Sequence, residues 1–123
     1  MRMPPGPFLE DVVSPDGLIA TDRLVAQLRI SKRELAALTG LSVEAVSKRS
    51  RLVSRKTQAR LRDTVDIINR VLPWSGSIAL AFAWFRSEPL PSFGDKTAQE
   101  LVKDGRAADV MRYLERIAEG GYA

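Results

Sequence analysis

The sequence predicts an all-α protein in which a helix-turn-helix is joined to a small C-terminal helical domain. Apolar residues recur at helical spacing along most of the chain. Residues that cap helix N-termini precede several of these runs, and glycine or proline follows them. We find no convincing strand and no internal repeat. The predicted organisation is an irregular lead-in over residues 1–15, a helix-turn-helix region over 16–72 and a third segment over 73–123.

Composition excludes several classes of protein. The 123 residues suit one domain or two very small ones, and an apolar fraction of 45% is too high for disorder. Cysteine and histidine are absent, which excludes disulfides, the usual zinc sites and thiol or imidazole catalysis. The longest apolar stretch, residues 78–85, is too short to cross a membrane, and the N-terminus lacks the apolar core of a secretory signal. We therefore expect a cytoplasmic protein.

The net charge of +4 is unevenly distributed. Residues 29–62 carry ten basic and two acidic side chains, whereas the segments before and after this stretch are each net negative. Positive charge concentrated in one segment is typical of a protein that binds a polyanion such as DNA. The alternative is a basic surface that is merely solvated.

The first half begins irregularly and then becomes helical. Residues 1–15 contain four prolines and a glycine, so we expect no packed element there. Thr21 can cap a helix that begins at Asp22, whose charge suits the positive end of the helix dipole. Ser31 and Glu34 form a capping box at the start of the next helix.

A tight glycine turn then leads into a second short helix. Gly40 ends the first helix, where a left-handed residue is favourable. Ser42 caps the second helix, which we expect over residues 43 to about 50. Ala36, Gly40 and Val46 have the spacing at which the two helices of a helix-turn-helix cross closely.

The outer face of this second helix is the predicted base-reading surface. Such a helix lies in the major groove, and nearby cations bind phosphates without reading sequence. Glu44 can accept a hydrogen bond from a cytosine amine or simply stabilise the helix start. The predicted base contacts are Val43, Glu44, Ser47, Lys48 and Arg51, the predicted phosphate contacts are Arg49, Arg55 and Lys56, and Ser42 is also among the predicted DNA-binding residues.

Helices also dominate the second half. A helix over about 56–72 should end at Pro73, and Ser75 can cap the next one. That next helix, within residues 76–87, is apolar on nearly every side, so we expect it to be buried in the middle of its domain.

A loop and two helices follow. Two prolines fix residues 88–94 as an extended loop that cannot be helical. Thr97 and Glu100 form a second capping box, and Gly105 closes the short helix that follows. The last helix should run from about residue 106 to residue 119.

Short motifs follow one another along about the last fifty residues. They are Ala83-Trp84-Phe85, Pro89-Leu90-Pro91, Phe93-Gly94, Thr97-Ala98, Glu100-Leu101, Gly105-Arg106, Tyr113-Leu114 and Gly120-Gly121. In order and spacing they resemble the toxin-binding domain of the Xre–MbcA–ParS antitoxins, and the helix-turn-helix before them resembles the Xre type.

This resemblance implies a type II antitoxin that pairs with a RES-domain toxin, which degrades NAD or ADP-ribosylates a protein. It also implies that the antitoxin obstructs the toxin's active site with its C-terminal region and represses its own operon. Two glycines would let the tail leave the last helix, and an aromatic ring beside the carboxylate could occupy the cleft. The expected toxin contacts are Pro89, Pro91, Phe93, Gly94, Gly120, Gly121, Tyr122 and Ala123.

Several alternatives stay open. Phe93 can instead fold back onto the core, and Tyr122 can pack on the last helix. The protein can also be a stand-alone repressor whose C-terminal domain dimerises or senses a ligand. We expect no enzymatic activity, cofactor or metal, because the acidic residues do not cluster by spacing. We expect a homodimer or a toxin–antitoxin hetero-oligomer, since operator binding by this motif needs two copies.

Overall fold

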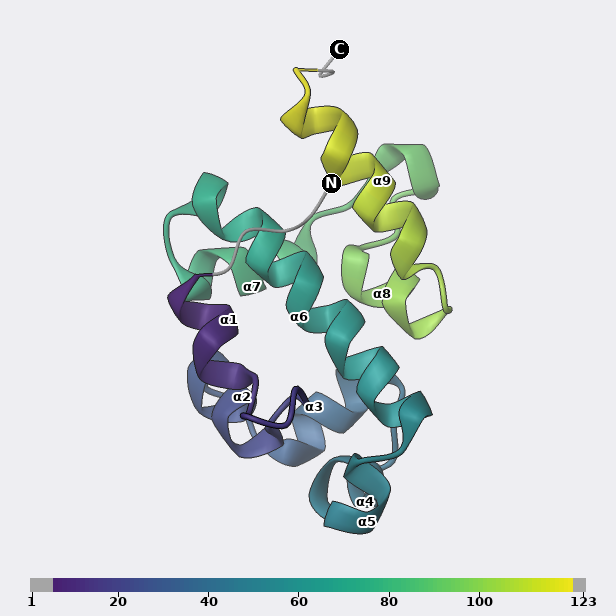
Figure 1. Cartoon of the computed structure of the whole chain (residues 1–123). Coiled ribbons are helices and arrows are strands. Elements are labelled where there is room, and N and C mark those ends of the chain that lie inside the picture. Colours follow the sequence, from purple (N-terminus) through teal and green to yellow (C-terminus); the bar gives the residue numbers. More distant parts are fainter. Residues whose placement is uncertain (1–5, 121–123) are drawn as a thin grey trace.

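The computed structural model describes residues 6–120, and every regular element within that range is helical (Figure 1). The prediction of an all-α fold is therefore confirmed. The elements are α1 (Pro7–Val12), α2 (Thr21–Leu28), α3 (Lys32–Thr39), α4 (Val43–Ser47), α5 (Arg49–Leu52), α6 (Arg55–Ser75), α7 (Ile78–Ser87), the 3₁₀ turn η1 (Pro91–Phe93), α8 (Ala98–Lys103) and α9 (Ala107–Ala118).

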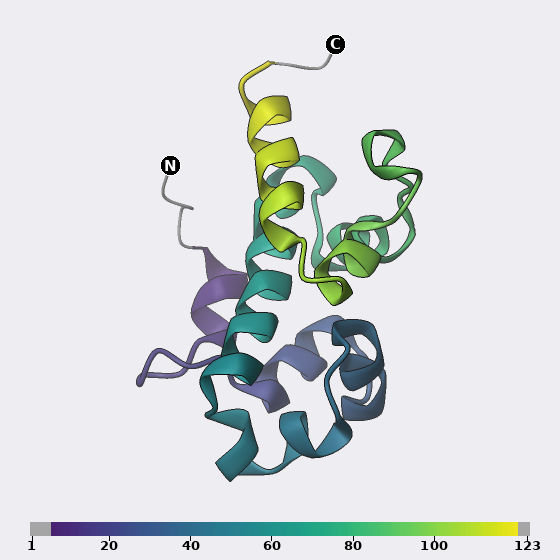
Figure 2. The same ribbon diagram turned by 90° about the vertical axis from the view of Figure 1, so that its right-hand side faces the viewer.

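The long helix α6 is the axis of the molecule. Helices α2–α5 lie at one end of it, while α7, α8 and α9 pack along its other part (Figures 1 and 2). Leu61, Val65 and Ile68 of α6 are fully buried in a single hydrophobic core. Helix α3 also packs against α8. The N-terminal and C-terminal halves therefore share one core instead of meeting through a linker.

Residues 7–12 correct the prediction of an irregular lead-in, because they form α1. Pro7 lies in the first turn of this helix, where a missing N–H costs nothing and the fixed φ favours helix. Phe8 and Val12, four residues apart, are both buried in the core. The backbone N–H of Ala20 donates to the Val12 carbonyl at 2.8 Å, which ties α1 to the start of α2.

Several predicted helix ends are confirmed and others are shifted. Ser31 with Glu34 and Thr97 with Glu100 both form the expected capping boxes. Thr21 is not a cap: it is the first residue of α2, and its buried Oγ1 has no hydrogen-bond partner within the described residues. Because Thr21 is itself helical, its hydroxyl is buried and does not accept a hydrogen bond from the unpaired N–H groups at the start of α2.

Pro73 does not end α6, which continues to Ser75. A proline removes the backbone hydrogen bond to the carbonyl four residues earlier, and α6 continues for only two residues beyond Pro73. The helix ends instead at Gly76, which has φ 93°. Ser77 caps α7, since its Oγ accepts a hydrogen bond from the N–H of Leu80 at 3.1 Å.

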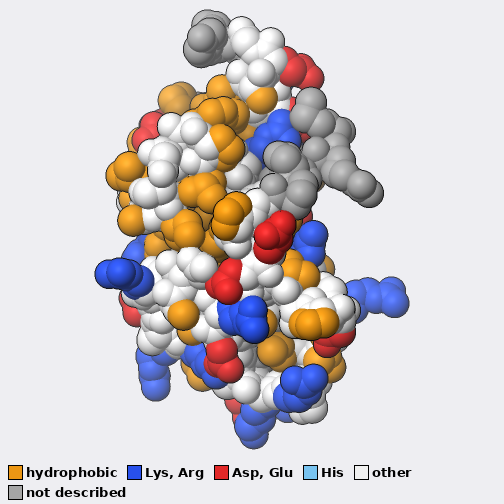
Figure 3. All heavy atoms as spheres, turned by 60° about the vertical axis from the view of Figure 1, so that its left-hand side comes forward, with side chains coloured by type: hydrophobic (Ala, Val, Ile, Leu, Met, Phe, Trp, Pro, Cys, Tyr) orange, Lys and Arg blue, Asp and Glu red, His pale blue; other side chains and the backbone are white. Residues whose placement is uncertain are grey.

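Helix α7 is half exposed, which corrects the prediction that it is buried in the middle of its domain. Ala81, Phe82 and Phe85 face the core, but Leu80 is 58% exposed. Trp74 at the end of α6 is 48% exposed. On the face shown in Figure 3, hydrophobic side chains gather in the upper part, and most Lys and Arg side chains lie in the lower part. None of the described helices is both long and apolar enough to cross a membrane.

Candidate functional site

The crossing of α3 and α4 has the features that its spacing predicts. Ala36 and Val46 are buried where the helices meet. Gly40 adopts the left-handed conformation at φ 73°, and the N–H of Leu41 donates to the Ala36 carbonyl at 3.0 Å. The turn is therefore closed by backbone geometry that only glycine adopts without strain.

The helix after this turn is shorter than predicted. Helix α4 has only five residues, and the backbone is extended at Lys48, with ψ 124°. A separate turn, α5, follows from Arg49 to Leu52. The expected continuous helix to about residue 50 is thus wrong. Buried Val46 holds the first turn against α3, whereas α5 has no fully buried side chain to extend that packing.

The predicted DNA contacts lie on this exposed end, but two of their cations are partly neutralised. Glu44 Oε2 lies 3.3 Å from Lys48 Nζ, and Glu44 Oε1 lies 3.8 Å from Arg51 Nη1. Ser42 uses its Oγ to cap α4, accepting from the N–H of Ala45 at 3.0 Å. The remaining predicted contacts are also exposed; they are Val43, Ser47, Arg49, Arg55 and Lys56.

The loop after α7 contains one turn of 3₁₀ helix, η1, and this corrects the prediction of a wholly extended segment. Leu90 is buried, and its N–H donates to the Lys96 carbonyl at 3.0 Å, so the loop closes on itself. Pro89, Pro91 and Gly94 are exposed around this closed loop. A proline at the start of a 3₁₀ turn costs nothing, because its nitrogen has no partner to lose there.

The sequence left open whether Phe93 packs on the core or contacts a partner, and the structure shows features of both. Its ring meets the Tyr113 ring edge-on, with 6.1 Å between centroids, and the Arg106 guanidinium lies 5.4 Å from the Phe93 centroid. Phe93 is nevertheless only partly buried. It also borders an open hollow of about 410 Å³ whose other lining residues are all on α9 or at its end. The ring is therefore fixed in place while part of it stays accessible to a partner.

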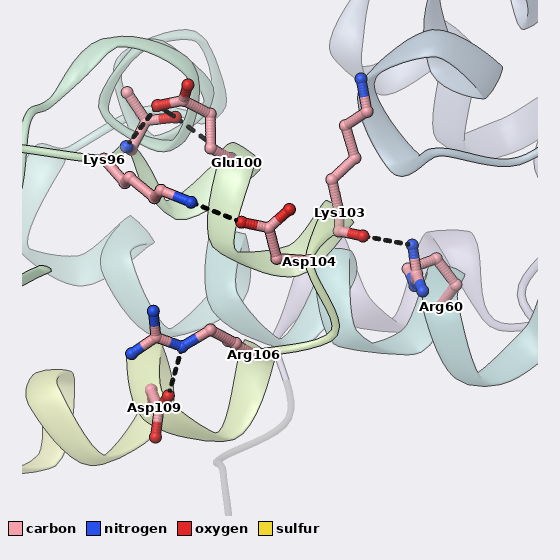
Figure 4. A network of polar contacts seen from close by, with 8 residues as sticks. Arg60, Lys96, Glu100, Lys103, Asp104, Arg106 and Asp109 are labelled. Atoms are coloured by element: carbon pink, nitrogen blue, oxygen red, sulfur yellow. Dashed lines mark hydrogen bonds and ion pairs between the residues drawn. The ribbon is translucent and has the colours of Figure 1, made fainter.

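One ion pair links the loop to the end of α8, and another lies at the start of α9 (Figure 4). Lys96 Nζ donates to Asp104 Oδ2 at 2.8 Å, and this hydrogen bond, with the charge of Lys96, lowers the pKa of Asp104. Arg106 Nε donates to Asp109 Oδ2 at 2.8 Å and similarly lowers the pKa of Asp109. These carboxylates stay ionised at neutral pH, so the network is intact there.

Part of the predicted tail site lies beyond the structural description. Gly120 has φ 82°, so the chain leaves α9 through a left-handed glycine as expected. Its N–H donates to the Ile117 carbonyl at 3.0 Å. The other three predicted tail contacts, Gly121, Tyr122 and Ala123, lie outside the described residues.

Sequence reasoning missed two arginines at structurally central positions. Arg106 was part of a recognised motif, but its place over the Phe93 ring follows only from the path of the loop. Arg60 reaches from α6 to the α3–α4 turn, where its Nη1 donates to the Thr39 carbonyl at 2.7 Å. Nothing in the sequence distinguishes Arg60 from the other cations of the basic segment.

The C-terminal segment of the chain matches a known protein family. Residues 71–120, from the last part of α6 through α9, match the family model of the antitoxin Xre/MbcA/ParS C-terminal toxin-binding domain. This C-terminal part of the chain is similar to the toxin-binding domain of the Xre/MbcA/ParS antitoxins, as the sequence resemblance implied, and the match supports an antitoxin of a toxin–antitoxin system. Neither a curated protein nor a solved structure matches the chain.

Proposed function

We propose that this antitoxin neutralises a RES-domain, NAD-consuming toxin in the cytoplasm by obstructing its active site with the C-terminal region. The observation that supports this most is the toxin-binding domain over residues 71–120. Within it, accessible Phe93 and the outer side of α9 border one hollow. The last turn of α9 points away from the rest of the protein (Figure 2). A toxin docked on this face would lie close to the last turn of α9.

The tail has the chemistry that such a plug requires. Gly120 already has a positive φ, which allows the chain to turn out of the helix. Tyr122 supplies a ring that can stack and a hydroxyl that can hydrogen-bond. Ordering the tail costs about 1–2 kcal/mol of conformational entropy per residue, and the contacts made in the cleft must contribute more than this.

Deletion of residues 120–123 tests the plug. We expect the truncated antitoxin still to bind the toxin through the helical face but to inhibit NAD consumption much less. Binding is measured by calorimetry and NAD turnover by fluorescence. A truncation that removes Met1–Pro4 serves as the control and should inhibit fully. Full inhibition by the C-terminal truncation would show that the helices, not the tail, obstruct the active site.

We further propose that the α3–α4 pair is a helix-turn-helix through which the protein represses its own operon. The close crossing at Ala36, Gly40 and Val46 supports this, as does the basic segment around it. The extended backbone at Lys48 limits the helix that can enter a major groove to α4. We therefore expect a larger share of the affinity to come from phosphate contacts than in a protein with a full recognition helix.

The alternative, a stand-alone repressor, is distinguished by the partner. Pull-down of a RES-type toxin by co-expression supports the antitoxin pairing with this toxin class. For DNA binding, gel shifts on the upstream region should weaken when Lys48 and Arg51 are replaced by alanine, by about 1–3 kcal/mol for each side chain that reads a base. Arg112→Ala on α9 is the control. Equal shifts by all variants would place the DNA-binding surface elsewhere.

Two copies are expected in the DNA-bound form, and we propose that α7 supplies the contact. This helix has an uncharged stretch from Ile78 to Phe85 with Leu80 exposed. An uncharged face can meet its own copy without like-charge repulsion. Leu80→Glu should shift light scattering toward the monomer, whereas Glu115→Gln on α9 should not. A parent protein that is monomeric both alone and with toxin would exclude this interface.

A further inference from the structure

The carbonyl ends of two helices meet at one arginine. Thr39 is the last residue of α3 and Lys103 is the last residue of α8. Arg60 Nη1 donates to the Thr39 carbonyl at 2.7 Å and to the Lys103 carbonyl at 3.4 Å. The last carbonyls of a helix carry its partial negative charge, so a cation between two such ends stabilises both. Figure 4 shows the Arg60 guanidinium directed at the Lys103 carbonyl.

Gly40 makes this approach possible. A Cβ at this position would lie 3.1 Å from Lys103 Cγ and 3.3 Å from Arg60 Nη1. The positive φ of Gly40 lets the chain turn immediately after Thr39, so that the turn passes beside Lys103 of α8. The α3–α4 turn, α6 and α8 therefore meet at one point, with Arg60 as the polar link.

The same end of α8 is also joined to the proposed toxin face. Asp104, the C-cap of α8, binds Lys96 at the end of the η1 loop. Arg106, two residues further, contacts both Phe93 and Asp109. A displacement of this loop or of α9 thus acts on α8 within one turn of the carbonyl that Arg60 binds.

We propose that Arg60 is a positioning residue that couples the toxin-binding domain to the α3–α4 turn. It makes the orientation of the DNA-reading end depend on α8, so that toxin binding alters the rigidity of the turn. The toxin part of this proposal rests on the proposed function, whereas the link between the two helix ends does not. To demonstrate such coupling, a response must be measured both at the α3–α4 turn and at the end of α8.

Amide hydrogen exchange of the free antitoxin tests the link. The N–H of Leu41 closes α3 and the N–H of Arg106 closes α8, at 3.0 and 2.7 Å from their acceptors. Arg60→Met keeps the aliphatic stem and removes the donors, so exchange at both amides should accelerate about tenfold or more. Arg62→Met, on the same helix, should change neither. Faster exchange at Leu41 alone, or at neither amide, would overturn the proposal.

Arg60→Lys covers the case in which the methionine variant does not fold. It retains the charge and N–H donors, and should restore part of the protection at both amides. In the antitoxin–toxin complex, toxin should slow exchange at Leu41 in the parent and not in Arg60→Met. Equal slowing in both would overturn the coupling role. Failure of the toxin to bind at all would instead contradict the proposed function, and leave the free-protein result standing.

Discussion

The carboxylate of Glu44 lies 3.3 Å from the ammonium of Lys48, across the first turn after the helix crossing. Lys48 is also the residue at which the helix breaks. At the proposed DNA-binding end, the cations Lys48 and Arg51 are therefore partly neutralised by an acidic side chain of the same protein. Both side chains are more than half exposed, so the pair contributes little to stability and can exchange for a DNA phosphate.

We expect Glu44→Gln to increase affinity for DNA of any sequence. The change frees Lys48 and Arg51 for phosphates and removes a negative charge from the surface. The salt dependence of binding should become steeper, by up to about 0.9 in slope for each additional phosphate contact. Fluorescence anisotropy over a salt series measures this. Glu115→Gln on α9 is the control, and an unchanged slope for Glu44→Gln would indicate that these cations do not face DNA.

Phe93→Ala should weaken toxin binding by more than about 1 kcal/mol, because a fixed and accessible aromatic ring is the usual form of an interface hot spot. The ring contacts Tyr113 and Arg106, so a small loss of stability is also expected. Val53→Ala removes an exposed apolar side chain from the other end of the protein and is the control. Calorimetry with equal affinity for parent and Phe93→Ala would remove η1 from the interface.

Thr21→Val should stabilise the protein by up to about 1 kcal/mol. The Thr21 hydroxyl is buried without a hydrogen-bond partner in the described structure, and valine has nearly the same shape. Thr39→Val is the matched control with the opposite sign, since the Thr39 hydroxyl donates to the Leu35 carbonyl at 2.7 Å. Urea denaturation compares the two. A loss of stability in both variants would show that the Thr21 hydroxyl is satisfied.

Asp63→Asn should raise the melting temperature at pH 7. Burial raises the pKa of Asp63 above its usual value, and the charge of Asp66 raises it further against the opposing effect of Arg60. A raised pKa in the folded state means that the ionised form destabilises the fold. The gain should therefore be present at neutral pH and disappear as the pH falls through the raised pKa toward the unfolded value.

Asp104→Asn is the control for this pH dependence. The hydrogen bond from Lys96 lowers the pKa of Asp104, so its ionised form stabilises the fold. Its replacement should lower the melting temperature at neutral pH, with the difference disappearing only as the pH falls below the usual value toward the lowered pKa. Differential scanning calorimetry between pH 2.5 and pH 7, roughly the range that spans these transitions, follows both variants. The same sign for both would contradict the assignment.

The sequence by itself determined the local features of this protein. Both capping boxes, the glycine turn at Gly40 and the limits of α9 within one residue follow from side chains that act on their own neighbouring backbone. The segment 71–120 was recognisable from the order of its motifs. Such signals involve residues close together in the chain, so they need no knowledge of the fold.

Only the tertiary structure decided which surfaces are free and which segments are linked. Helix α1 forms because Phe8 and Val12 find a place in a core built by distant helices. Helix α7 is exposed on one side because no described element covers it, although its composition suggests burial. The convergence of Thr39 and Lys103 on Arg60 joins residues that lie 21 and 43 positions from it in sequence. Burial and long-range hydrogen bonds depend on how all the helices pack together, and a local sequence pattern does not determine that packing.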